Sequence, residues 1–194
     1  MRAILLLLFA ALPVAAQETL ELRLTLVVFA GGAWPESEAV ATAQEATRIL
    51  GQCGVVATPP QVVHADEPPE FRQFQSSRSR ALARKLQPHK PAVFFVDGTL
   101  QRPAFDAEAI GRGNSRLRPE LADTVWIVRD ARDPGVALAH ELAHVLMDSG
   151  EHSEEPGNLM RDETAPQSTR LTDAQCARLR ATGAANGLLG VAVR

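Results

Sequence analysis

The sequence contains no tyrosine and only two cysteines, and aromatic residues make up 5% of its 194 residues. It also has no excess of positive charge, because 20 Lys and Arg residues stand against 23 Asp and Glu residues. Proteins that bind nucleic acids carry a marked basic surface, so we expect no nucleic-acid partner. The 13 glycines and 13 prolines show no period, which excludes collagen-like and low-complexity chains. With 45% hydrophobic residues and a net charge of -3, the composition predicts a folded domain.

The first residues have the order of a secretory signal peptide. Arg2 supplies positive charge, Ala3–Leu12 is apolar, and Val14–Ala16 offers small residues for cleavage. The apolar run is too short for a confident membrane span, and no second long run follows. We therefore expect a signal peptide at 1–16 and a single domain at 17–194 that is exported to the periplasm or secreted, without stable membrane insertion. A retained N-terminal anchor is the alternative.

Hydrophobic patterning predicts strands interleaved with helices. We expect strands at 20–30, 55–56, 62–63, 92–96 and 124–128, and helices at 36–52 and 79–86. The stretch 98–122 reads as a long irregular loop, a kind of segment that often carries function. This order predicts an α+β fold whose N-terminal part is α/β-like.

The most informative segment is His140-Glu141-Leu142-Ala143-His144. We expect it in a helix with Asp133 as N-cap and Pro134 in the first position. Residues four apart lie on one face of a helix, so His140 and His144 can point at one ion. Glu141 is offset by one position and can lie beside that ion. This spacing suits two zinc ligands and a general base.

His152 is the leading candidate for a third ligand, since it follows His144 by eight residues and Gly150 permits a sharp turn between them. Three protein ligands and one open position are typical of catalytic zinc. Asp148 is the first alternative, because it continues the four-residue spacing from His144. Weaker alternatives are Glu151, Glu154, Glu155 and Glu163.

The run from His140 to Met160 resembles the core of the metzincin metallopeptidases. The resemblance implies that His140, His144 and His152 bind one zinc ion, that Glu141 is the base, and that Met160 forms an apolar floor beneath the metal. It also implies a small domain with a twisted, mostly parallel sheet, an active-site helix and a C-terminal helix. The family spacing differs here, since Met147 stands at the family's glycine position and the third histidine comes two residues later.

On this resemblance we expect an exported endopeptidase that hydrolyses peptide bonds through a zinc-bound water activated by Glu141. Its partner would be a peptide or protein substrate, bound in extended form beside an edge strand, for which 124–128 is our candidate. Some family members steady the oxyanion with a tyrosine, which this chain lacks, so Arg161 is a candidate by proximity. The alternative is a secreted zinc-binding or interaction module with weak or no peptidase activity.

The two cysteines, Cys53 and Cys176, predict one disulfide if the chain is exported. The alternatives are two free buried thiols, or Cys53 acting as a zinc-blocking switch. A T-x-x-Q capping box at 172–175 predicts a final helix through Arg180, which would carry Cys176.

Overall fold

The computed structural model describes residues 18–101 and 104–192. The expected signal peptide at 1–16 lies outside these residues. Among the described helices, none has the length and apolar character needed to cross a membrane.

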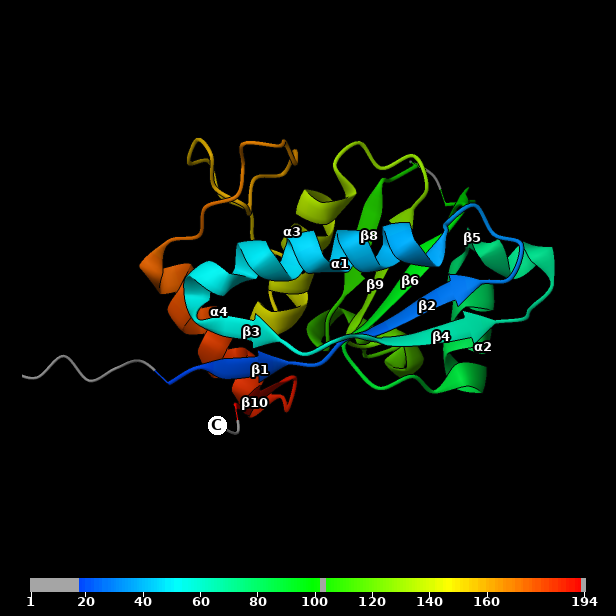
Figure 1. The fold of residues 1–194 in the computed structure, drawn as a ribbon, viewed down its shortest axis with the longest axis horizontal. Helices are drawn as coiled ribbons and strands as arrows, with labels where there is room; N and C mark the ends of the chain where they lie inside the picture. Colours follow the sequence, from blue (N-terminus) through cyan, green and yellow to red (C-terminus); the bar gives the residue numbers. More distant parts are fainter. Residues whose placement is uncertain (1–17, 102–103, 193–194) are drawn as a thin grey trace, which may run out of the picture.

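A five-stranded sheet in the order β4-β2-β6-β9-β8 forms the centre of the molecule (Figure 1). All neighbouring strands in it are parallel except β8, which runs antiparallel to β9. A smaller sheet joins β10, β1 and β3, and β5 pairs with β7. The strands are β1 Leu20–Leu22, β2 Thr25–Phe29, β3 Val55–Ala57, β4 Gln61–Ala65, β5 Gln73–Phe74, β6 Ala92–Val96, β7 Gly98–Thr99, β8 Ala107–Ile110, β9 Thr124–Val128 and β10 Leu189–Val191.

The helices are α1 Glu36–Leu50, α2 Ser76–Leu86, α3 Pro134–Met147 and α4 Asp173–Ala185. Helices α1 and α3 pack against each other on one face of the large sheet, and α2 lies behind the sheet in the view of Figure 1. Every residue of β2, β6 and β9 is buried, as expected of strands covered on both faces. The expected α+β class with a mostly parallel sheet is therefore confirmed.

The single strand expected at 20–30 is wrong, because the chain changes sheets inside it. β1 pairs with β10 and β3, whereas β2 pairs with β4 and β6. The reason lies in burial: β1 alternates around the partly exposed Glu21, and β2 is buried throughout. A strand with one solvent-exposed face belongs in the small sheet, and a fully apolar one in the centre of the large sheet.

The stretch 98–122 is not irregular throughout, because it contains β8. This strand forms the outer edge of the large sheet, so β9 has neighbours on both sides. The expectation that 124–128 is an edge strand is therefore wrong. Trp126 in its middle is fully buried and stacks on Phe94 with ring centroids 4.0 Å apart.

A disulfide between Cys53 and Cys176 ties the end of α1 to α4. α1 ends at Leu50 and is continued by a short 3-10 turn through Cys53, and Gly54 then takes a left-handed conformation with φ 69°. The expected capping box opens α4, since the Thr172 side chain accepts from the Gln175 N–H and the Gln175 side chain accepts from the Thr172 N–H. The helix continues past the expected end at Arg180 to Ala185.

Candidate metal centre

Helix α3 carries two of the three histidines and is buried along nearly its whole length. It packs against α1, α4, β8 and β9. Asp133 is the N-cap residue and Pro134 begins the helix as expected, but the Asp133 side chain makes no capping hydrogen bond. Packing of its buried side chains, rather than a capping hydrogen bond, therefore stabilises α3.

The imidazoles of His140 and His144 are oriented by backbone carbonyls. The Nδ1–H of His140 donates to the Leu159 carbonyl oxygen at 2.7 Å, and that of His144 to the Ser149 carbonyl oxygen at 2.6 Å. A carbonyl oxygen only accepts, so each ring must carry its hydrogen on Nδ1. The Nε2 lone pairs are then free, and the two Nε2 atoms lie 2.9 Å apart.

His152 brings a third imidazole to the same point. Its Nε2 lies 3.2 Å from Nε2 of His144, and the candidate ligand atoms of all three rings lie within 4.8 Å of one another. On its other side, Nδ1 of His152 lies 3.5 Å from a carboxylate oxygen of Asp162. All three rings thus turn Nδ1 toward an oxygen and Nε2 toward one another, which is the usual arrangement around a bound metal.

The buried histidines are poised to be neutral. Burial lowers the pKa of His140, and it lowers the pKa of His144 to about 4, with a further contribution from the neighbouring His140. Only a neutral imidazole offers a lone pair to a metal ion. At neutral pH the imidazoles of His140 and His144 are therefore already neutral, and a cation can bind to them without displacing a proton.

The turn that delivers His152 is made by Asp148 rather than by Gly150. α3 ends at Met147, and Asp148 adopts a left-handed conformation with φ 46°. Gly150 has no positive φ. The chain is then held by the Ser153 N–H, which donates to the Met160 carbonyl oxygen at 2.7 Å.

Because the helix ends before Asp148, this residue does not continue the face that carries His140 and His144. Its carboxylate instead accepts from the Gly113 N–H at 2.8 Å, which ties the loop after β8 to the end of α3. Glu151 pairs with Arg178 at 2.5 Å. In the described part of the chain, the group of potential metal ligands at this point comprises the three histidines, and neither Asp148 nor the glutamates expected as alternatives belong to it.

Glu141 lies beside the histidines and against the edge strand. Burial raises the pKa of Glu141 to about 8. A hydrogen bond from the Ala109 backbone lowers this pKa in part, and the negative charge of Glu108 raises it further. The side chain is therefore a neutral acid near pH 7 while no cation is close. A carboxyl group with a pKa near neutrality is suited to exchange protons with a substrate.

Two adjoining cavities, of about 340 and 450 Å³, meet at His140 and Glu141. The first is lined on one side by Glu108, Gly111 and Asn114, and the second by Asp106 and Arg132. Segments 105–109 and 111–114 thus form one wall of a cleft. Burial raises the pKa of the Glu108 carboxyl group, and the positive charge of Arg118 partly opposes this rise.

Met160 is buried, and it lines a further cavity together with His152 and Met147. The turn before it is tied down by backbone hydrogen bonds, since the Leu159 N–H donates to the Arg170 carbonyl oxygen at 2.6 Å. This turn supplies the Leu159 carbonyl that orients His140. Arg161, expected near an oxyanion, does not line either cavity next to the histidines, whereas Arg132 does.

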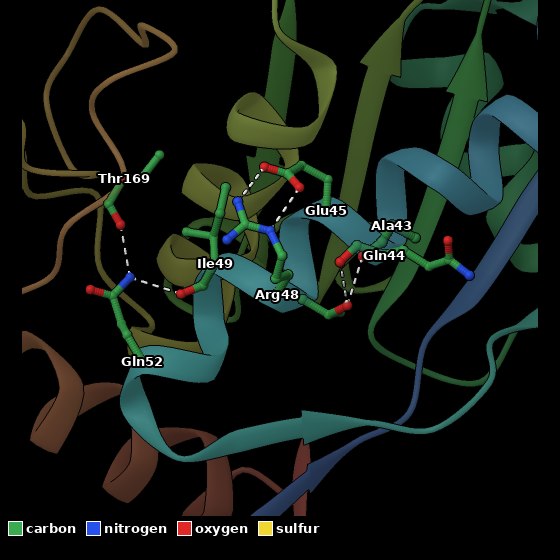
Figure 2. Close-up of polar contacts among 8 residues, drawn as sticks. Ala43, Gln44, Glu45, Arg48, Ile49, Gln52 and Thr169 are labelled. Atoms are coloured by element: carbon green, nitrogen blue, oxygen red, sulfur yellow. Dashed lines mark hydrogen bonds and ion pairs between the residues drawn. The ribbon is translucent and has the colours of Figure 1, made fainter.

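Gln52 supports this turn from the end of α1, and sequence reasoning gave no sign of it. Figure 2 shows its amide donating to the carbonyl oxygens of Ile49 and Thr169, each at 2.8 Å. Its side-chain oxygen accepts from the Leu171 N–H at 2.8 Å. Gln52 thus holds both neighbours of Arg170, whose backbone in turn holds Leu159.

The two remaining histidines, His64 and His89, lie apart from the cluster. His64 Nε2 lies 3.1 Å from a carboxylate oxygen of Glu36, and His89 is exposed near the start of β6. Neither belongs to the group of potential ligands found in the described residues.

A scan against protein-family models and a search of curated proteins found no match. Among solved structures, the fold is similar to that of metalloproteinase-II from Bacteroides fragilis, with a TM-score of 0.61 and 20% sequence identity. The similarity covers 88% of this chain and 55% of the other, so this chain spans about half the length of that protein. The described residues thus form a mixed α+β domain whose fold is similar to that of this metalloproteinase, and they bring together three histidines that could hold a metal ion.

Proposed function

We propose that this chain is a metzincin-like zinc endopeptidase in which His140, His144 and His152 hold one zinc ion and Glu141 is the general base. The observation that carries the proposal is the orientation of the three rings. Each turns Nδ1 toward an oxygen atom, so the three Nε2 atoms converge beside a carboxyl group.

The donor set fits zinc. Bare nitrogen lone pairs 2.9 and 3.2 Å apart repel one another, and a cation between them removes the repulsion. Imidazole nitrogens are favoured zinc ligands, and three of them leave a coordination position open for chemistry. When bound in such a site, zinc acts as a Lewis acid that polarises a carbonyl group and acidifies water.

Glu141 supplies the proton transfers of peptide hydrolysis. Its carboxylate accepts a proton from the attacking water and passes it to the leaving amine. A nearby cation favours the ionised form and therefore opposes the effect of burial on the pKa of Glu141. The Ala109 N–H holds the carboxyl group in place during the exchange.

The free edge of β8 replaces β9 as the proposed substrate-binding strand. The Val128 N–H donates to the Asp106 carbonyl oxygen, and Glu108 lies opposite Trp126. Because backbone groups alternate in an antiparallel pair, Ala107 and Ala109 turn theirs away from β9. An extended peptide can pair with these groups, apart from the Ala109 N–H that Glu141 uses, and its scissile bond would then lie beside the histidines.

We also propose that the protein is exported as one domain at 17–194 after removal of 1–16, to the periplasm or the outside of the cell. The disulfide between Cys53 and Cys176 supports this, since such bonds persist in oxidising compartments and are rare in the cytosol. Met160 is proposed as the apolar floor of the site, which its burial supports.

The experiment combines metal analysis with cleavage of an unfolded protein. The parent is expected to bind one equivalent of zinc and to cleave, and Glu141→Gln to bind zinc but cleave about 100-fold to 10,000-fold more slowly. His152→Ala is expected to lose more than about 100-fold in zinc affinity, more than the loss typical of a residue that only orients a ligand. His89→Ala is the matched control, because this exposed histidine lies apart from the cluster.

The outcomes separate the two functions under consideration. If Glu141→Gln binds zinc and cleaves as fast as the parent, the peptidase function is wrong. If the parent binds zinc and cleaves nothing, the chain is the zinc-binding or interaction module instead. If purified protein holds no zinc, neither function applies.

A further inference from the structure

We propose that the cleft selects peptides with a lysine or arginine close to the scissile bond, and that Glu108 of β8 is the specificity-determining residue. This inference names a substrate class for the site and rests on the proposed peptidase function.

The first observation is the charge of the cleft walls. Besides Glu141, five acidic residues line the two cavities: Asp106, Glu108, Asp148, Asp162 and Glu163. Arg132 is the one lysine or arginine among the residues that line the two cavities, and it lines the second cavity. The first cavity, which contains all three histidines, has no lysine or arginine among its lining residues. A cleft lined by one sign of charge attracts substrates of the opposite sign.

The second observation distinguishes Glu108 from the other carboxylates. Asp148 is engaged by the Gly113 N–H, and Asp162 faces His152. Glu108 is half-buried, and no ion pair or side-chain hydrogen bond joins it to another described residue. The positive charge of Arg118 lowers the pKa of Glu108, but the Arg118 guanidinium donates its hydrogen bond to the Ser76 hydroxyl. A carboxylate that is partly removed from water and has no ion-pair partner among residues 18–101 and 104–192 gains from a cationic ligand.

The third observation is the register of the edge. A peptide paired antiparallel with β8 places one residue directly opposite Glu108, with its side chain on the same face. The neighbours of Glu108 on the strand are Ala107 and Ala109, whose methyl groups lie on the other face. Glu108 is therefore the one long side chain of the strand centre that can meet a substrate side chain. Opposite charges in such cross-strand pairs attract, and like charges repel.

The test uses a set of quenched fluorescent peptides of one sequence, with Lys, Gln or Glu placed in turn at each of three positions on both sides of the bond. The readout is the ratio of kcat/KM for the Lys and Gln peptides, because a ratio does not depend on how much enzyme is active. For the zinc-loaded parent we expect a ratio of about 5 at one position, as for one opposite-charge cross-strand pair. The ratio should fall as ionic strength rises.

Two substitutions and a control complete the design. In Glu108→Gln the ratio is expected to fall to about 1, and in Glu108→Lys the Glu peptide should become the better substrate. Glu154→Gln, which removes an exposed carboxylate outside both cavities, should keep the preference of the parent.

Failure of this inference differs from failure of the proposed function. If the parent cleaves the Lys, Gln and Glu peptides equally at every position, or if Glu108→Gln retains the preference, Glu108 does not set specificity although the peptidase function stands. If the zinc-loaded parent cleaves none of the peptides and no unfolded protein, both are overturned.

Discussion

Replacing Glu141 by glutamine is expected to stabilise the metal-free protein, and to do so more strongly as the pH rises. The pKa of this carboxyl group is raised from 4.5 to about 8 in the folded chain. Between these values the folded chain keeps a proton that the unfolded chain has released. Stability falls with rising pH wherever the folded state binds more protons, so ionisation of Glu141 opposes folding.

The magnitude follows from the width of this pH window. One pKa unit corresponds to about 1.4 kcal/mol, so the parent should lose about 3.5 kcal/mol of unfolding free energy from this group between about pH 5 and about pH 8. The lowered pKa values of His140 and His144 act in the opposite direction, because below about pH 6.5 the unfolded chain binds protons that the folded chain does not. That contribution is shared by parent and variant and cancels in their difference. Glutamine does not titrate, and its oxygen can still accept from the Ala109 N–H.

The assay is urea unfolding of chelator-treated protein at several pH values, comparing parent, Glu141→Gln and the exposed control Glu154→Gln. The difference between Glu141→Gln and parent should grow with pH, whereas Glu154→Gln should follow the parent. A difference that stays constant with pH would refute the reasoning about burial. Adding zinc should shrink the difference, because a cation favours the carboxylate. Since the variant is expected to be inactive yet more stable, loss of cleavage cannot be attributed to misfolding.

Two further predictions concern stability. Replacing Cys53 and Cys176 by serine should lower the unfolding free energy by about 2–5 kcal/mol in urea unfolding, because the disulfide spans 123 positions of the sequence; an unchanged midpoint would contradict this. Gly135→Ala should destabilise by about 1–3 kcal/mol, because a Cβ there would lie 2.5 Å from Cγ of Glu45 on the neighbouring helix. Gly150→Ala is its matched control, since a Cβ there meets nothing within 4 Å, and its unfolding and zinc binding should equal those of the parent. Equal effects of the two alanines would contradict the packing argument.

The differences between sequence-based expectations and structure have identifiable causes. β8 was missed because Ala107-Glu108-Ala109-Ile110 contains residues of low strand propensity, and its extended form comes from pairing with β9. Missing it also led to the wrong edge strand, since β9 looks like an edge only when its outer neighbour is unknown. Sheet order arises from long-range pairing, which a single sequence does not state.

The sequence by itself determined what depends on local spacing. An i, i+4 pair places His140 and His144 on one helix face, and a T-x-x-Q pattern opens α4, because helical geometry repeats over a few residues. The tertiary structure alone decided that Asp148 turns the chain so that His152 joins the other two rings. It also decided which oxygens face the three Nδ1 atoms, and that Glu141 lies against the edge strand. These features join segments distant along the chain, and their geometry is set by packing around one core rather than by the residues' own conformational preferences.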